Sequence, residues 1–153
     1  MGTAAESNTT SRIESEIEVR MFLKDLRFAL QNGAKIDFQE VRRVDENRDP
    51  KFTNRYTVAA LFPDEKPTDA LRRELQTLTV EEYLRTVKDT RFPKKKEMRE
   101  FGKVYNGTQD VYIKLRVELL NPNGVGNHTT FVMSFHFAEK PLADEVFPYK
   151  KKA

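Results

Sequence analysis

The chain has 153 residues, with 27 Lys and Arg, 24 Asp and Glu, two His and no Cys. This length fits one domain whose core needs no disulfide or metal to hold it. The missing cysteine excludes disulfides and thiol catalysis, and two histidines alone cannot build a Cys/His zinc site. The first 18 residues lack an apolar core segment, and no apolar run approaches membrane-spanning length. We therefore expect a cytoplasmic protein without a membrane partner.

The charge is unevenly distributed along the chain. The net charge is +3, but residues 85–116 hold ten Lys and Arg against four Asp and Glu, which gives this stretch +6 and leaves the rest at −3. A basic stretch of this kind is the first indication of an anionic partner.

In chain order, we expect residues 1–18 to be disordered and residues 19–150 to form a single domain. Within "EVRMFLKDLRFALQNG" (18–33), apolar residues at helical spacing predict an amphipathic helix of about three turns that ends at Gly33. Residues 34–41 favour a short strand. The Asn, Asp and Pro residues of 45–51 are typical of a loop.

Three short helices are predicted next. The segment "TNRYTVAALF" looks helical and stops before Pro63. A second helix takes Thr68 as its N-cap and continues to about Leu75. The third covers "LTVEEYLRTV", with Thr79 as N-cap and Glu82 at capping-box spacing.

From about Glu97 the apolar residues no longer follow helical spacing and instead recur at every second position. The segment "DTRFPKKKEM" is a charged loop broken by proline, and "MREFGKVYN", "QDVYIKLRVELL" and "TTFVMSFHF" are typical of three consecutive strands. Turns at "NGTQ" and "NPNGVGNH" join them. Helices followed by an antiparallel meander define an α+β class, with an antiparallel sheet of three or more strands packed against N-terminal helices.

The last two strands alternate apolar and polar residues. The odd-numbered residues 111–119 and 131–137 form apolar faces, so both sets meet one core if the strands form a hairpin. The two registers that fit the loop place His136 opposite Tyr112 or opposite Lys114. Either register gathers Tyr112, Lys114, Arg116 and His136 on the other face.

This polar face has two interpretations. An antiparallel sheet needs one solvated face, where Tyr, Lys and Arg are ordinary. Alternatively, two cations, a phenol and an imidazole converge on an anionic substrate such as a phosphodiester, and imidazole titrates near neutral pH as acid–base catalysis requires. The lysines of the neighbouring loop are either simply solvated or extend an electrostatic track for a nucleic-acid backbone.

Four segments, taken in order, are similar to one family. The stretches "ELQTLTVEEYLRTVKD", "FGKVYNGTQDVYIKLRVEL", "FVMSFHFAEKPL" and "FPYK" resemble the MqsR-like toxins of bacterial toxin–antitoxin pairs, which belong to the RelE-like mRNA interferase group. The upstream "NRYTVAALFPDEKPTDALRREL" resembles the two short helices that precede them in that family. The resemblance covers residues 52–150, with the N-terminal helix a looser match.

The resemblance implies a RelE-like fold and a ribonuclease that needs neither metal nor cofactor. The ribose 2′-hydroxyl attacks the adjacent phosphate in such enzymes, which leaves a 2′,3′-cyclic phosphate and a 5′-hydroxyl. Cleavage of mRNA, free or on the ribosome, would inhibit translation and growth, and a cognate antitoxin protein would neutralise it. The alternative is a non-catalytic RNA-binding or antitoxin-binding module with the same fold.

Position by position, Tyr112 and Lys114 match the family's "VYIK", and His136 falls where the family has lysine or histidine, which makes it the candidate general acid. Arg85 and Arg99 fall where the family has lysine and, in some members, glutamine. Arginine binds phosphate but is a poor base, so the general base is Tyr112 or Lys114 if neighbouring cations depress its pKa. The residues expected to bind RNA are Lys88, Lys94, Lys95, Lys96 and Arg116.

Overall fold

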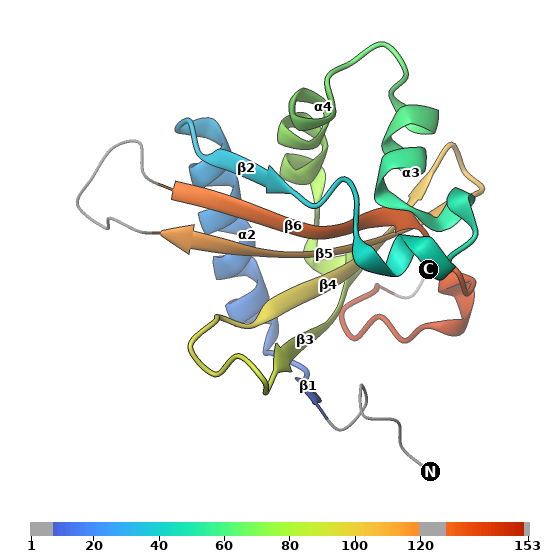
Figure 1. The fold of residues 1–153 in the computed structure, drawn as a ribbon. Helices are drawn as coiled ribbons and strands as arrows, with labels where there is room; N and C mark the ends of the chain where they lie inside the picture. Colours follow the sequence, from blue (N-terminus) through green and yellow to red (C-terminus); the bar gives the residue numbers. More distant parts are fainter. Residues whose placement is uncertain (1–7, 120–127, 152–153) are drawn as a thin grey trace.

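The computed structural model describes residues 8–119 and 128–151 of the chain. In this part, three helices pack on a six-stranded sheet, which makes the fold α+β as expected (Figure 1). The predicted turn at 121–127 and residues 1–7 of the predicted disordered segment lie outside the described residues. The helices are α2 (Glu16–Gln31), α3 (Asn54–Leu61) and α4 (Pro67–Glu74), and the strands are β1 (Thr9–Arg12), β2 (Lys35–Phe38), β3 (Tyr83–Asp89), β4 (Met98–Tyr105), β5 (Gln109–Leu119) and β6 (His128–Phe137).

The sheet has the strand order β1-β3-β4-β5-β6-β2. All neighbours are antiparallel except β2, which runs parallel to β6, so the sheet is mixed rather than purely antiparallel as predicted. The long helix α2 lies behind the central strands in Figure 1 and covers one face of the sheet. The core between them contains Val19, Leu23, Leu26 and Leu30 of α2 and Phe101, Val111, Ile113, Leu115, Val132 and Phe135 of the sheet.

The predicted helix over 18–33 is confirmed as α2. The Ser15 hydroxyl accepts a hydrogen bond from the backbone of Glu18, and the Glu18 carboxylate accepts one from the backbone of Ser15, so the helix begins with a capping box. Gly33 follows its end at φ +77, a left-handed conformation that favours glycine.

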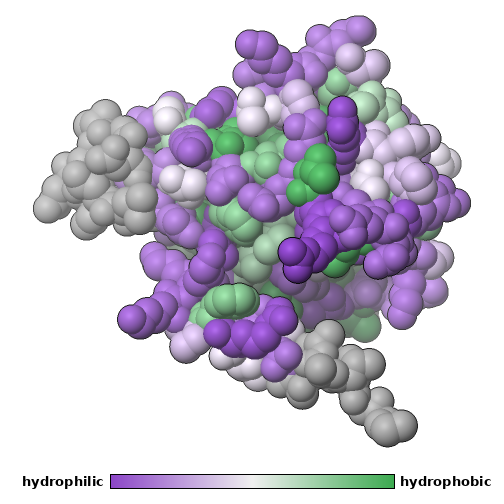
Figure 2. Space-filling model, viewed as in Figure 1, coloured by the Kyte–Doolittle hydropathy of each residue, from purple (hydrophilic) through white to green (hydrophobic). Residues whose placement is uncertain are grey.

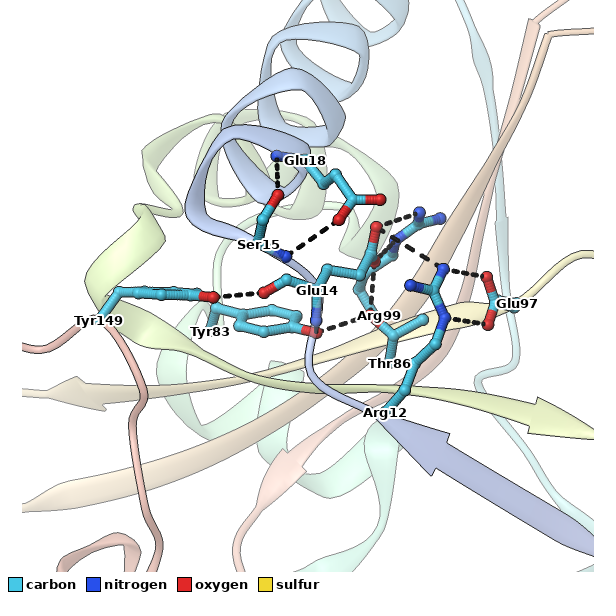
Figure 3. A network of polar contacts seen from close by, with 9 residues as sticks. All are labelled: Arg12, Glu14, Ser15, Glu18, Tyr83, Thr86, Glu97, Arg99 and Tyr149. Carbon is cyan, nitrogen blue, oxygen red and sulfur yellow. Dashed lines mark hydrogen bonds and ion pairs between the residues drawn. The ribbon is translucent and has the colours of Figure 1, made fainter.

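Residues 8–18 were predicted to be disordered, and that prediction is wrong. They form β1, which pairs with β3, and the start of α2. The reason is Glu14, whose side chain is only 3% exposed and whose carboxylate accepts hydrogen bonds from Arg99 and Thr86 (Figure 3). The backbone of Glu14 is also held at both ends, because its N–H donates to the Tyr83 hydroxyl and its carbonyl accepts from that of Tyr149.

Two helix predictions between 66 and 89 are also wrong in detail. The capping box of Thr79 and Glu82 exists, but it caps only the short 3-10 turn Val80–Glu82, and the chain continues as β3. Tyr83 is fully buried and pairs with β4, so tertiary packing overrides the local helix signal. Helix α4 begins at Pro67, one residue before the expected N-cap Thr68.

The register of β5 and β6 changes along the hairpin. His136 lies opposite Tyr112, which is one of the two predicted registers, but a bulge between Lys114 and Leu115 shifts the pairing by one residue. A one-residue shift exchanges the two faces of a strand. Val132 therefore enters the core, and Phe131, which was predicted to face the core, pairs with Arg116 on the polar side.

Candidate functional site

The face of the sheet opposite α2 holds a cleft of about 300 Å³. This face is turned toward the viewer in Figures 1 and 2, and Figure 2 shows apolar surface in its middle with hydrophilic residues around it. The floor of the cleft is formed by Tyr112 and Lys114 of β5 and Ser134 and His136 of β6. The remaining lining comes from Leu84 of β3, from the segment after β2 and from the chain that follows β6, and includes Arg42, Arg48, Glu139, Leu142 and Glu145.

His136 is built to accept a proton. Its Nδ1 lies 2.9 Å from the Phe137 carbonyl oxygen, and since a carbonyl only accepts, Nδ1 carries the hydrogen and Nε2 keeps its lone pair. Burial lowers the pKa of His136 below 6.5, and Arg48 and Arg42 lower it further. The imidazole is therefore neutral at pH 7, a state that suits a general base better than the general acid that was expected.

Tyr112 lies against His136, with ring centroids 5.3 Å apart. Burial raises the pKa of Tyr112 well above 10, and the Glu100 carboxylate adds to the shift. The idea that nearby cations depress this pKa is wrong, because Arg85 and Arg42 act in that direction but are outweighed. Tyr112 stays a protonated phenol at neutral pH, which is a hydrogen-bond donor.

Lys114 is the cation on the floor of the cleft. Burial lowers the pKa of Lys114 from 10.5, Arg42 acts in the same direction, and Glu100 opposes the shift. Lys114 forms no ion pair with any carboxylate in residues 8–119 and 128–151. Its ammonium group is therefore available to an anionic ligand.

Arg42 was not predicted from the sequence. It is half-buried, and its guanidinium lies 3.4 Å from Ser134 Oγ. Its backbone N–H donates to the Asp45 carboxylate at 2.8 Å, but its guanidinium forms no ion pair within the described part of the chain. No local signal marks it, since it lies outside the basic stretch and reaches the cleft through a contact 92 residues away in sequence. Arg48 and Lys140 also line the cleft, but Arg48 pairs with Glu139 and Lys140 is exposed. Arg42 and Lys114 are the partly buried cations of the site that a phosphate could bind.

Arg85 lies on the same face but is already occupied. Its guanidinium donates to Glu100 at 2.6 Å and also binds Glu145 from the C-terminal segment. Two carboxylates thus neutralise one arginine, so Arg85 holds Glu145, a residue that lines the cleft, and is not a free phosphate clamp.

Arg99 lies on the other face, away from the remaining predicted catalytic residues. It pairs with Leu115, stacks over the Phe22 ring at 4.6 Å and donates to both carboxylate oxygens of Glu14 at 2.7 and 3.1 Å (Figure 3). A larger cleft of about 820 Å³ lies there, but Glu14 and Glu97 in it are paired with Arg99 and Arg12. Its arginine and two of its carboxylates are therefore paired within the protein.

The predicted RNA-binding residues divide into two groups. Lys94, Lys95, Lys96 and Arg116 line a third cleft, of about 510 Å³, together with Phe131 and Thr129. Lys88 instead donates to the carbonyl oxygens of Pro93 and Lys95 and holds the β3–β4 loop in place.

No family model, curated protein or solved structure matches this chain. Among the described residues, none of the helices is both long and apolar enough to span a bilayer. In the same part of the chain, His, Asp and Glu side chains form no group of three that could hold a metal. Fold and site define an α+β protein with a polar cleft on the uncovered face of its sheet.

Proposed function

We propose that this protein is a metal-independent endoribonuclease of the mRNA interferase kind, with a RelE-like fold, and the toxin of a toxin–antitoxin pair. The observation that carries the proposal is the His136 imidazole, which is neutral and has a free Nε2 beside a protonated phenol and two unpaired cations. The motifs that resemble MqsR-like toxins support the same activity and fold. Its cytoplasmic location and its neutralisation by a cognate antitoxin remain part of this proposal.

The proposed reaction uses each group of the cleft once. His136 Nε2 accepts the proton of the ribose 2′-hydroxyl, whose oxygen attacks the adjacent phosphorus. Arg42 and Lys114 stabilise the additional negative charge of the pentacovalent phosphorane. The Tyr112 hydroxyl protonates the 5′-oxygen as the P–O bond breaks, which yields a 2′,3′-cyclic phosphate and a 5′-hydroxyl.

The test is an assay with RNA oligonucleotides in EDTA, with and without ribosomes, that detects the cyclic phosphate. We expect His136→Ala to lower the cleavage rate by about 100-fold or more. Arg42→Ala should also lower it strongly, whereas Arg43→Ala removes an exposed neighbouring cation and should change little. The proposal fails if wild-type protein makes no cyclic phosphate in either condition, or if His136→Ala makes it at the wild-type rate.

A non-catalytic RNA-binding or antitoxin-binding module is the second candidate. The pairing of Arg85 with Glu100 and Glu145 favours it, since this removes one cation from the phosphate site. This candidate predicts RNA binding that weakens with salt, survives His136→Ala and gives no cyclic product. Expression in a bacterial host further separates the two candidate functions. Only an enzyme would cause a growth arrest that His136→Ala relieves.

A further inference from the structure

The register shift in the β5–β6 hairpin places an aromatic ring on the face that carries the cleft. Phe131 pairs with Arg116, which lies two residues along β5 from Lys114, the partner of Ser134. Same-face positions on a strand are about 7 Å apart, so the Arg116–Phe131 pair lies about 7 Å from Lys114 and about 14 Å from the Tyr112–His136 pair. A phenylalanine turned away from the core in this way needs an explanation other than core packing.

One face of the Phe131 ring packs against a cation that is held in a fixed orientation. The Arg116 guanidinium lies 4.2 Å from the ring centroid, and Arg116 is only 6% exposed. Its Nε donates to Glu118 at 2.7 Å, which fixes the orientation of the guanidinium. The ring is half-buried and lines the cleft of about 510 Å³, so part of it faces open space.

Three lysines flank this ring from the β3–β4 loop. Lys94, Lys95 and Lys96 are exposed and form no ion pair with the carboxylates in the described part of the chain. Glu118 balances the one arginine of the cleft, and Asp37 adds one negative charge, so the three lysines leave the rim with a net positive charge. An aromatic platform beside unpaired cations is the arrangement that binds single-stranded nucleic acid, because the base stacks while the backbone is held electrostatically.

We propose that Phe131, backed by Arg116, is a stacking subsite for one base of single-stranded RNA, and that Lys94, Lys95 and Lys96 hold the backbone beside it. This inference rests on the proposed function in taking RNA as the ligand. It adds a binding determinant next to the cleft that holds His136. Since stacking accepts any base, the subsite contributes affinity and alignment rather than sequence readout.

The test measures binding of a fully 2′-O-methylated RNA oligonucleotide, which cannot be cleaved, by fluorescence anisotropy. We expect Phe131→Leu to weaken binding roughly 10-fold and Phe131→Trp to retain or strengthen it. Phe92→Leu is the matched control, because Phe92 is also an aromatic beside Arg91 and Lys95 but lies outside this cleft. The control variant should bind within about twofold of wild type.

Abasic substitutions then locate the stacked base. One abasic position should weaken wild-type binding but not the already weakened binding of Phe131→Leu. Equal binding by folded Phe131→Leu and wild type overturns the inference, as does weakening by Phe131→Trp equal to that by Phe131→Leu. Cleavage is measured separately with unmodified RNA. If the abasic position and Phe131→Leu are coupled but no RNA is cleaved, the subsite is supported and the nuclease is rejected. If RNA is cleaved but the two changes are not coupled, the nuclease is supported and the subsite is rejected.

Discussion

Replacing Glu14 tests whether Arg99 belongs to the fold or to the site. Glu14 is 3% exposed and accepts two hydrogen bonds from Arg99, at 2.7 and 3.1 Å, and one from Thr86. Removing one partner of a buried ion pair costs about 3–5 kcal/mol, but Arg99 is 21% exposed and recovers part of its hydration. We therefore expect Glu14→Ala to lower the free energy of unfolding by about 2–3 kcal/mol and the Tm by about 5–10 °C. Glu14→Gln keeps the shape and should cost about 1–2 kcal/mol.

The pH dependence of this loss has a definite sign. Burial alone would raise the pKa of Glu14, but the hydrogen bonds from Arg99 and Thr86 outweigh it, so the pKa lies below its usual 4.5. The stabilisation by the carboxylate is therefore complete above about pH 4.5 and disappears as the pH falls through the lower folded pKa. The difference between wild type and Glu14→Ala should shrink in the same range.

Urea denaturation from pH 3 to pH 8 measures both the loss of stability caused by Glu14→Ala and the pH dependence of that loss. Glu16→Gln is the control, because the ion pair of Glu16 with Arg20 is exposed at both ends and should contribute less than about 0.5 kcal/mol. A double-mutant cycle with Arg99→Ala should show strong coupling to Glu14. If Glu14→Ala costs no more than the control, or if the two substitutions are additive, the structural role of Arg99 is refuted.

Three further outcomes are expected. The cleavage rate should rise with pH through an apparent pKa below 6.5 and then level off, because His136 must be neutral to act as a base; a rate that falls through this pKa would indicate the acid role. Gly102→Ala should cost about 1–3 kcal/mol in urea denaturation, since the new Cβ would lie 2.9 Å from Leu142 Cδ2. Glu145→Gln should remove one of the two carboxylates that pair with Arg85 and tighten RNA binding at low salt, while Asp144→Asn, an exposed neighbour, should change it less.

Periodicity predicted most of the elements because each is amphipathic in its own segment. The helix α2 and the first half of β5 bury one regular face against a common core, and this regularity is visible in the sequence. The helix predicted for residues 78–87 was wrong for the opposite reason. Its capping box is a genuine local signal, but the pairing of Tyr83 with β4 depends on residues that are distant in the chain.

Alternation along the strands also explains which of the predicted site residues lie together in the structure. Tyr112 and His136 meet because both lie on the polar face before the register shift. Arg99 could have been excluded by the same rule, since it lies two residues from the fully buried Phe101 on β4 and so shares its face. Arg42 could not have been found, because it belongs to a loop with no periodic pattern.

The loop that carries Arg42 and the strand that carries Phe131 are joined by one side chain. The Asn54 amide donates to the Gln39 carbonyl at 2.7 Å and to the Met133 carbonyl at 2.9 Å, while its oxygen accepts from the Phe135 backbone. These bonds fix the segment before Arg42 and satisfy β6 backbone groups beside the register shift. Because Asn54 is 1% exposed, water cannot replace them, and a buried amide with these three partners specifies a single arrangement. The positions of Arg42 and Phe131, which carry the two proposals, thus rest on a contact that no local pattern in the sequence reveals.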